Sequence, residues 1–598
     1  MCGIIGYIGN NEKKQIILNG LKELEYRGYD SAGLAILAQN EIHNFKAVGK
    51  IVNLENKCKD FSSQGFGIGI GHTRWATHGK PSESNAHPHF AEFSSVVHNG
   101  IIENYMQIKQ ELESSGHKFV SQTDTEVIVH LFEENLKAHK TPMQAFEKTI
   151  ARLSGAYAIL LITKAAPDSV FYAKKGSPLI IGKGEGTNGG IYFSSSDAPL
   201  IGFAQRVCYL EDGVVGCIDS DGFESLQGIV ALNATKSYAQ KDGFRFFMEK
   251  EIYEQHKVLL ETMMGRVSDE FIGFEEVEKE FFEGIDEITI CACGTSYHAG
   301  LSAKYLLERE SKIKCNVVFA SEYRYAEPVM RRNELFVCVS QSGETADTLE
   351  ALKLAKKNGL KSLAICNVDN SSIVRESDRC ILTRAGIEKG VASTKAFATQ
   401  VMTLWILSVY VGFVRGVIKK EAFMSYAQTM LKASKLTKVD SKLHDRLKRL
   451  SKRYLHGHGF FFIGRDVFYP LALEGALKLK EISYLHAEGY PSGEMKHGPI
   501  ALADSELFCL ALMPKHILFE KIKSNVEELG ARDSTICAIC TDEVEGADDM
   551  IYIPHTAHYM EEFYAMMVVL QLLALEISIK LGNDVDMPRN LAKSVTVE

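Results

Sequence analysis

The chain has 598 residues, of which 45% are hydrophobic and 24% are charged, and its formal net charge is −9. This composition excludes a disordered, collagen-like or coiled-coil protein as a global description, and the length predicts several compact domains. The negative balance and the lack of a basic arm argue against nucleic acid as a partner.

The hydropathy pattern argues against a membrane protein. The two longest apolar runs, Val401–Val414 and Phe563–Leu575, fall short of the about 18 to 20 residues that a spanning helix needs, so we interpret both as buried helices. The first residues lack the basic region and the long apolar core of a secretory signal. We therefore expect a cytoplasmic protein with no membrane partner.

Thirteen cysteines are scattered from Cys2 to Cys540. An odd number in a long intracellular chain argues against a disulfide framework. Two close pairs lie in apolar, strand-like runs and have no second pair at zinc spacing beside them, namely Cys291/Cys293 and Cys537/Cys540. We interpret them as small buried hydrophobic residues rather than as a metal or redox site.

In chain order, residues 1–230 combine short apolar runs with a few polar helical segments, which predicts one layered α+β domain. The polar stretch 231–248 is interpreted as a linker. Strands that end in glycine turns then alternate with helices over 249–420 and again over 445–585. This repetition predicts two α/β domains whose parallel sheets are covered on both faces. The tail 586–598 lacks helical periodicity.

Cys2 directly follows the initiator Met1. Removal of Met1 would leave a thiol and a free α-amine on one residue, and an α-amine with a pKa of about 8 can activate a thiol as a nucleophile. The alternative is an accidental, buried cysteine at position 2. The residues around it decide in favour of the nucleophile.

Several polar residues follow apolar strands and complete a candidate site for an amino acid. Arg74 follows one strand and suits a substrate carboxylate. Asn99 and Gly100 end another and can supply N–H donors to an oxyanion. Asp124 opens a helix, where it could bind an ammonium group or simply cap the helix.

The blocks MCGIIGYIG, LEYRGYDSAGLA, GHTRWATHG, NAHPH, HNGIIEN and TDTEVI resemble the glutaminase domain of the N-terminal-nucleophile amidotransferases. That resemblance implies a four-layered α/β/β/α domain in which Cys2 attacks the side-chain amide of glutamine. Asn99 and Gly100 would stabilise the oxyanion. Arg74 and Asp124 would hold the carboxylate and the amine of glutamine, and Trp75 would gate the ammonia path. Thr77 and His78 would belong to the loop that closes over glutamine.

Five histidines in this region could suggest a metal, but their spacing fits no closed site, so no metal is expected: His72, His78, His87, His89 and His98.

Two turns in the second half have the form of phosphate sites. Ser340–Thr345 and Gly294–Ser296 each follow a strand and open a helix, where backbone N–H groups, hydroxyls and the helix dipole favour an anion. Ordinary helix capping is the alternative for either turn alone. Their tandem occurrence, with Val391–Lys395 nearby, favours a phosphorylated ligand, and the glycine patterns of nucleotide-binding loops are absent from the turns.

Glu474, Lys478 and Glu481 share one face of a predicted helix. They could form a solvated ion-pair stripe or an acid–base set in a pocket. His497 follows in an apparent loop and adds a group that can shuttle protons near neutral pH.

The blocks CGTS, SQSGETADT, GVASTKAF, EGALKLKEISY, KHGP and DVDMPRNLAKSVTVE resemble the sugar-isomerase half of the glutamine–fructose-6-phosphate aminotransferases, in their bacterial form. That resemblance implies that Lys593 forms a Schiff base with the keto carbon and that Glu481 moves a proton between C1 and C2, supported by Lys478. His497 would assist ring opening from the neighbouring subunit of a homodimer, and Glu388 is a weaker candidate. Fructose 6-phosphate would be bound by Thr295, Ser296, Ser340, Gln341, Ser342, Thr345, Val391 and Ser393.

The sequence therefore predicts an enzyme that takes ammonia from L-glutamine and channels it to D-fructose 6-phosphate, giving D-glucosamine 6-phosphate without a metal or redox cofactor. One rival is a phosphoribosyl-type amidotransferase, which would need an acidic pyrophosphate-binding loop that the chain lacks. The other is a regulatory sugar-phosphate sensor, which would leave Cys2, Glu481 and Lys593 without a role.

Overall fold

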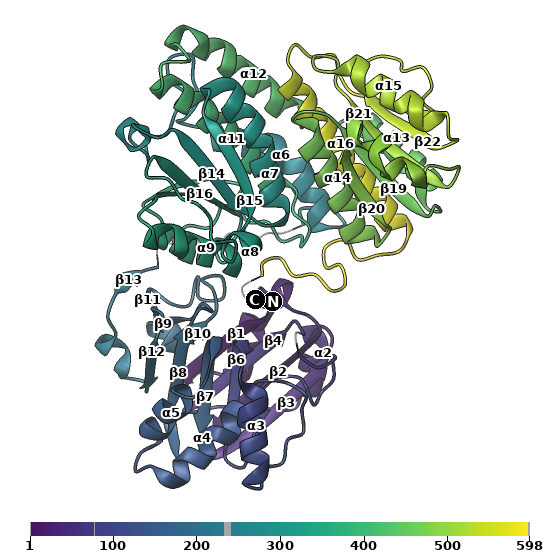
Figure 1. The fold of residues 1–598 in the computed structure, drawn as a ribbon. Coiled ribbons are helices and arrows are strands. Elements are labelled where there is room, and N and C mark those ends of the chain that lie inside the picture. Colours follow the sequence, from purple (N-terminus) through teal and green to yellow (C-terminus); the bar gives the residue numbers. More distant parts are fainter. Residues whose placement is uncertain (1, 77, 233–240, 596–598) are drawn as a thin grey trace. The chain divides into compact units, whose positions relative to one another are not determined.

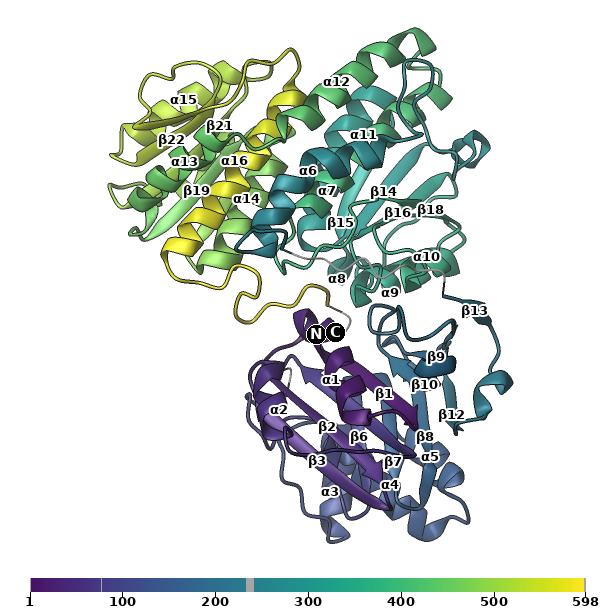
Figure 2. The same cartoon turned by 180° about the vertical axis from the view of Figure 1, so that it is seen from behind.

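The computed structural model describes residues 2–76, 78–232 and 241–595. The chain divides into two compact units, Met1–Tyr238 with Ala592–Glu598, and Ala239–Leu591 (Figures 1 and 2). Part of the predicted linker, 233–240, lies outside the described residues. The end of that linker is already helical, because α6 (Phe247–Met263) begins within it.

The first unit contains two antiparallel sheets. The larger has the strand order β13-β11-β9-β10-β1-β4-β2-β3, and the smaller has the order β12-β8-β7-β6-β5. The larger sheet is made of β1 (Gly3–Gly9), β2 (Ser31–Ala38), β3 (Glu41–Val48), β4 (Gly67–Arg74), β9 (Ile180–Gly184), β10 (Gly190–Ser194), β11 (Arg206–Tyr209) and β13 (Ile229–Ala231). The smaller is made of β5 (His89–Phe90), β6 (Ser94–Ile102), β7 (Gly155–Thr163), β8 (Ala166–Lys175) and β12 (Val214–Ile218).

Helices cover the outer face of each sheet, so the unit has the predicted α/β/β/α layers (Figure 1). The larger sheet is covered by α1 (Lys13–Leu24) and α2 (Ile51–Lys57). The smaller is covered by α4 (Glu126–Ala138) and α5 (Pro142–Ile150), and α3 (Tyr105–Ser114) packs against α4 in the same apolar core. A fully buried core that includes Ile4, Ile70 and Leu160 lies between the two sheets.

Strand β4 shows how the sequence produces these layers. Glycines and isoleucines alternate along it, and the period of two places them on opposite faces of the sheet. Ile68 and Ile70 enter the core between the sheets. The glycines lie under α1, where a Cβ on Gly71 would come 2.3 Å from Ile17 Cγ2. The alternation therefore lets the helix approach closely on one face while the other face fills the core.

The second unit contains two five-stranded parallel sheets with the same internal order, β15-β14-β16-β17-β18 and β20-β19-β21-β22-β23. The first is made of β14 (Glu287–Ala292), β15 (Lys314–Phe319), β16 (Glu334–Ser340), β17 (Lys361–Cys366) and β18 (Arg379–Leu382). The second is made of β19 (Gly459–Gly464), β20 (Ala487–Pro491), β21 (Leu507–Met513), β22 (Thr535–Cys540) and β23 (Asp549–Tyr552). Both predicted parallel sheets are confirmed.

Helices alternate with these strands. Those around the first sheet are α6, α7 (Gly294–Leu306), α8 (Ala320–Tyr323), α9 (Ala346–Lys357), α10 (Ser372–Glu376) and α11 (Lys395–Val414). The remainder are α12 (Phe423–Leu436), α13 (Ser441–Leu450), α14 (Phe468–Ser483), α15 (Phe519–Gly530) and α16 (Tyr559–Lys580). One hydrophobic core includes Ile290 of the first sheet, Phe462 of the second, Trp405 of α11 and Leu570 of α16. The two repeats therefore share a core, and the outer faces have their own smaller cores.

Two helices are longer than the apolar runs in the sequence suggest. α11 has 20 residues and α16 has 22, so both are long and apolar enough to cross a membrane. In the most apolar window of each, 89% and 94% of the residues are buried inside the protein. The expectation that these segments are too short was wrong, whereas their interpretation as buried helices agrees with this packing.

Candidate active sites

Cys2 immediately precedes β1, and strands β4 and β6 bring two other segments to it. Its Sγ atom is 3.5 Å from the backbone nitrogen of Trp75 and 3.6 Å from the Trp75 carbonyl oxygen. The side-chain amide of Asn99 donates a hydrogen bond of 3.3 Å to the Cys2 carbonyl. The fold therefore assembles residues that are 73 and 97 positions apart in the chain.

The electrostatics leave the Cys2 thiol in need of a base. Burial raises its pKa, and the hydrogen bond with Trp75 and the charge of Arg74 only partly oppose this effect. A neutral thiol is a weak nucleophile, so attack on a carbonyl requires that the proton be removed. The α-amine that Cys2 would carry after loss of Met1 is the base that the sequence predicts.

Arg74 ends β4 and is only 3% exposed. Its Nη2 donates to the carbonyl oxygens of His78 and Gly79, the latter at 3.0 Å. Its Nη1 is buried without a hydrogen-bond partner among the described residues. A buried, unpaired guanidinium nitrogen is costly unless a ligand pairs with it, and a carboxylate is the best match.

Asp124 does not cap the helix that it precedes. It is 4% exposed, and its Oδ2 accepts a hydrogen bond of 2.7 Å from the Ile102 nitrogen at the end of β6. The helix α4 begins with Thr125 as its N-cap residue. The simple capping alternative is therefore not observed, and Asp124 is near enough to Cys2 and Arg74 to influence the pKa of each.

Asn99 is oriented by a residue whose role the sequence did not indicate. His72 Nε2 lies 3.1 Å from Asn99 Oδ1 and 3.1 Å from the His98 carbonyl. Burial lowers the pKa of His72 to about 3, and the charge of Arg74 adds to this effect, so the ring is neutral near pH 7. A neutral ring that donates from Nε2 fixes the carbonyl end of the amide and leaves its NH₂ group to face Cys2.

Gly100 has a φ of +131°, and a Cβ at this position would lie 2.0 Å from the Ala156 carbonyl oxygen. Only glycine avoids both the strain and the collision, so the residue fixes the backbone at the expected oxyanion site.

The remaining histidines around this site behave as core groups. The ring of His87 lies 4.1 Å from that of His72 and 4.7 Å from that of His89. Burial lowers the pKa of His87, His89 and His98. Among the described residues, no group of three or more His, Cys, Asp or Glu side chains could hold a metal ion.

The loop after β4 carries the other predicted glutamine-binding residues. Trp75 lies beside Cys2, and the ring of His78 is 5.5 Å from that of Tyr105. Thr77 lies outside the described residues.

The predicted sugar-phosphate turns lie at the carboxyl ends of parallel strands. Ser340 ends β16, and its Oγ accepts from the Gly343 nitrogen at 3.0 Å and lies 3.3 Å from Thr345 Oγ1. Ser342 Oγ accepts from the Glu344 nitrogen at 3.2 Å. Gln341 lies in the same turn. Hydroxyl groups therefore gather at the N-terminus of α9, where the helix dipole favours an anion.

The second turn connects three helices. Thr295 Oγ1, on α7, donates to Glu474 Oε1 at 3.0 Å and accepts from Lys478 Nζ at 3.1 Å, and both partners are on α14. Ser296 Oγ accepts from Gln400 Nε2 of α11 at 3.0 Å. Because a hydroxyl has one proton, that of Thr295 is already donated to Glu474 and is not available to a phosphate in this state.

In the stripe on α14, Glu474 and Lys478 are buried and the side chain of Glu481 is 20% exposed, so the stripe is not a solvated ion-pair face. Lys478 is 1% exposed and lies 2.7 Å from Glu481 and 3.4 Å from Glu474. Burial alone would lower the pKa of Lys478, but attraction to Glu474 and Glu481 outweighs it and raises this pKa. Lys478 is therefore a cation that orients the carboxylates, which suits a supporting role better than that of a base.

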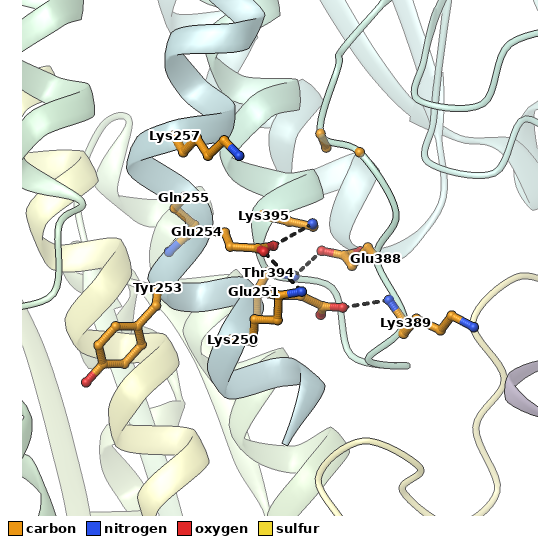
Figure 3. Close-up of polar contacts among 12 residues, drawn as sticks. Lys250, Glu251, Tyr253, Glu254, Gln255, Lys257, Glu388, Lys389, Thr394 and Lys395 are labelled. Atoms are coloured by element: carbon orange, nitrogen blue, oxygen red, sulfur yellow. Dashed lines mark hydrogen bonds and ion pairs between the residues drawn. The ribbon is translucent and has the colours of Figure 1, made fainter. Parts of the chain in front are cut away.

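The loop that carries Val391 and Ser393 is held by buried carboxylates (Figure 3). Glu388 accepts from Ser393 Oγ at 3.0 Å and from the backbone nitrogens of Thr394 and Ala396 at 2.9 and 3.0 Å. It therefore caps α11 rather than presenting itself as an acid or base.

From α6, Glu251 accepts from the backbone nitrogens of Lys389 and Gly390 at 2.6 and 3.1 Å, and Glu254 pairs with Lys395 at 2.9 Å (Figure 3). The Val391 nitrogen donates to the Asp586 carbonyl at 3.0 Å.

Two predicted residues are not brought into this cluster. His497, at the end of a 3-10 helix (Ser492–His497), is exposed, and none of its hydrogen bonds or ion pairs joins it to the cluster within the described parts of the chain. Lys593 belongs to the C-terminal segment that groups with the first unit. Their roles remain predictions. Conversely, the sequence did not single out His298, Gln400 or Glu251, and it considered His72 only as a metal ligand, because each contacts a partner that is distant in the chain.

Comparison with known proteins supports the predicted family of each half of the chain. The family model described as a glutamine amidotransferase domain matches residues 72–201, and the model described as a SIS domain matches 282–410 and 457–576. Glutamine–fructose-6-phosphate aminotransferases (isomerizing) of Campylobacter jejuni and Helicobacter pylori are 60% and 58% identical, each over 100% of both chains.

Among solved structures, the C-terminal domain of glucosamine-fructose-6-phosphate aminotransferase from Francisella tularensis is 40% identical, with a TM-score of 0.56, and covers 58% of this chain and 100% of its own. The chain belongs to the family of glutamine–fructose-6-phosphate aminotransferases (isomerizing).

Proposed function

We propose that the chain transfers the amide nitrogen of L-glutamine to D-fructose 6-phosphate and isomerises the product to D-glucosamine 6-phosphate, releasing L-glutamate. The observation that supports this most directly is the presence of two different buried sites in one chain. One has Cys2 beside Asn99 and the unpaired Nη1 of Arg74, and the other has the hydroxyl-lined turns beside Lys478.

In the first unit, we propose that Cys2 attacks the amide carbon of glutamine while its α-amine takes the thiol proton. The amide NH₂ of Asn99 and the backbone N–H of Gly100 stabilise the oxyanion. Arg74 pairs with the substrate carboxylate, and Asp124 with its ammonium group. Thr77 and His78 belong to the loop that closes over the substrate, and Trp75 gates the ammonia path. Ammonia leaves, and water hydrolyses the thioester to glutamate.

In the second unit, we propose that the turns before α7 and α9 bind the phosphate group, while Val391 and Ser393 line the sugar. Lys593, from the C-terminal segment, forms a Schiff base at C2 with loss of water, so that C2 carries a C=N bond. Ammonia then adds at C2 and displaces the lysine amine, after which Glu481 moves a proton from C1 to C2, so that C1 becomes the carbonyl carbon and C2 carries the amine. His497 from the partner subunit of a homodimer assists ring opening. No metal or redox group is needed, because lysine supplies the carbonyl chemistry and glutamine supplies the nitrogen.

Two further expectations belong to this proposal. Ammonia passes between the two sites without release to solvent. The protein acts in the cytoplasm, and the burial of α11 and α16 supports their role as core helices there.

The test is incubation with amide-¹⁵N glutamine and fructose 6-phosphate, followed by mass spectrometry of the sugar phosphates. We expect ¹⁵N-labelled hexosamine phosphate from the native protein and none from Cys2→Ala. Failure of a folded, ligand-binding protein to form the product would contradict the proposal and favour a sugar-phosphate sensor. Excess unlabelled ammonium tests channelling, because a channelled nitrogen keeps its label.

A further inference from the structure

His298 lies on α7, one turn after Thr295, and contacts the buried carboxylate of α14. Its Nδ1 is 2.8 Å from Glu474 Oε2, while Glu474 Oε1 accepts from Thr295 Oγ1 at 3.0 Å and lies 3.4 Å from Lys478 Nζ. The side chains of His298 and Glu474 are 13% and 3% exposed. The two oxygens of the Glu474 carboxylate therefore have different partners: Oε2 contacts His298, and Oε1 contacts Thr295 and Lys478.

From this geometry we propose that His298 is a positioning residue for the sugar-phosphate site: it holds Glu474 ionised and in a fixed orientation, and Glu474 in turn orients Thr295 and Lys478. The inference rests on the proposed function, because it assigns a role within that reaction. Among the described residues, the ring of His298 is hydrogen-bonded to Glu474, and it acts on the site through that carboxylate.

The physical argument begins with the cost of a buried carboxylate. Burial raises the pKa of Glu474, but attraction to Lys478 and the hydrogen bonds from His298 and Thr295 outweigh this and leave the pKa below its ordinary value. Loss of His298 would leave Oε2 buried without its donor, so the carboxyl group would take up a proton at a higher pH. A protonated or rotated Glu474 would no longer fix the Thr295 hydroxyl or share the ammonium group of Lys478 with Glu481.

The other charged groups around this pair have partners of their own. On α14 these are Lys478 and Glu481, 2.7 Å apart, and before α11 Glu388 caps the helix. Further along α7, Lys304 pairs with Glu308 at 2.6 Å.

The remaining charged and aromatic residues near His298 also have partners of their own. In the π-turn that continues α7 (Leu307–Ser311), Arg309 pairs with Asp466. Tyr297, next to His298, stacks on Phe319 of β15 at 3.7 Å. Removal of His298 therefore takes a hydrogen-bond donor from Glu474 and leaves these pairs in place.

The test compares His298→Ala with His298→Asn, in which the amide NH₂ replaces the Nδ1 donor. The measured quantity is kcat/KM for fructose 6-phosphate at saturating glutamine as a function of pH, with glutamine hydrolysis recorded in parallel. We expect the acidic limb to move up by roughly one pH unit in His298→Ala and to return toward its original position in His298→Asn. At a pH below that limb, kcat/KM of His298→Ala should be about tenfold lower than that of the native protein.

His444→Ala is the matched control. His444 is also buried against a carboxylate, with its Nε2 2.8 Å from Glu576 Oε1, but it lies on α13 outside the site. We expect this variant to lower the unfolding midpoint and to leave the acidic limb where it is.

Three results would overturn the proposal: an unmoved limb in His298→Ala, equal shifts in His298→Ala and His298→Asn, or a loss of kcat/KM that is uniform across pH. If His298→Ala does not fold, Glu474→Gln replaces it, and we then expect the acidic limb to disappear, whereas its persistence would refute the role of Glu474. Absence of hexosamine phosphate from the unchanged protein would instead contradict the proposed function itself.

Discussion

Replacement of Gly100 by alanine tests the predicted oxyanion site most sharply. The residue sits at the end of β6 with φ of +131°, and the added methyl group would start 2.0 Å from the Ala156 carbonyl oxygen and 2.9 Å from His98 Nε2. Ala156 belongs to the paired strand β7, which cannot retreat without breaking its register with β6. The backbone at Gly100 must therefore move, and its N–H group moves with it.

The expected loss of stability has two contributions. A non-glycine residue in this backbone region costs about 1 to 3 kcal/mol. The collision with a fixed strand adds about 1 to 3 kcal/mol of overpacking. For catalysis, loss of one donor from an oxyanion hole lowers kcat by about 10² to 10³. We expect Gly100→Ala to destabilise the first unit and to lower kcat for glutamine hydrolysis by at least about 100-fold.

The assay is release of glutamate from glutamine, together with chemical denaturation followed by tryptophan fluorescence. Gly116→Ala is the control, because Gly116 has φ of +93° in the same unit but has nothing within 4 Å of an added Cβ. Gly116→Ala should be destabilised by the backbone strain alone and should keep its activity. A folded Gly100→Ala protein with an unchanged kcat would refute the assignment of this backbone to the oxyanion.

Three further predictions concern other steps. Arg74→Lys should raise KM for glutamine at least about tenfold and leave KM for fructose 6-phosphate unchanged in steady-state assays, because lysine lacks the planar fork. Glu251→Gln should raise KM for fructose 6-phosphate several-fold with normal glutamine hydrolysis, because the loop nitrogens of Lys389 and Gly390 lose a charged acceptor. An unchanged KM in either variant would contradict its assignment. Burial raises the pKa of Glu126, but hydrogen bonds from His130, Ser121 and Val120 lower it from 4.5 to about 2. The ionised Glu126 therefore contributes about 3 kcal/mol to the free energy of unfolding above pH 4.5, and this contribution is lost as the pH falls toward 2. In Glu126→Gln the free energy of unfolding, measured by denaturation at a series of pH values, should change less between pH 4.5 and 2. An unaltered pH dependence would refute this prediction.

The duplicated half has two corresponding turns, and the one in the first repeat belongs to the predicted site. After β14, Thr295 meets Lys478 from α14 of the other repeat. At the corresponding position after β19, Asp466 is paired with Arg309 at 2.8 Å, and Arg309 lies in the π-turn that continues α7. The second position is therefore filled by an internal ion pair. Of these two polar contacts between α7 or its π-turn and the second repeat, the one between Thr295 and Lys478 belongs to the predicted site.

Much of the fold follows from the sequence alone. Alternating glycine and isoleucine in β4, and continuous apolar strands followed by hydroxyl-rich turns, determine the layers and the two parallel sheets, because burial on one or two faces imposes those patterns. The same local patterns place Cys2, Arg74 and Ser340 at strand ends, where side chains can meet a ligand.

Only the tertiary structure decided which of the remaining polar residues are buried and what they contact. Taken alone, the sequence of the α14 stripe favours a solvated ion-pair surface, and the burial of Glu474 and Lys478 depends on α7 packing across them. His72 on Asn99 and His298 on Glu474 are contacts between residues 27 and 176 positions apart. A hydrogen bond over such a separation leaves no periodicity in the sequence, because it is set by how the elements pack rather than by local propensity.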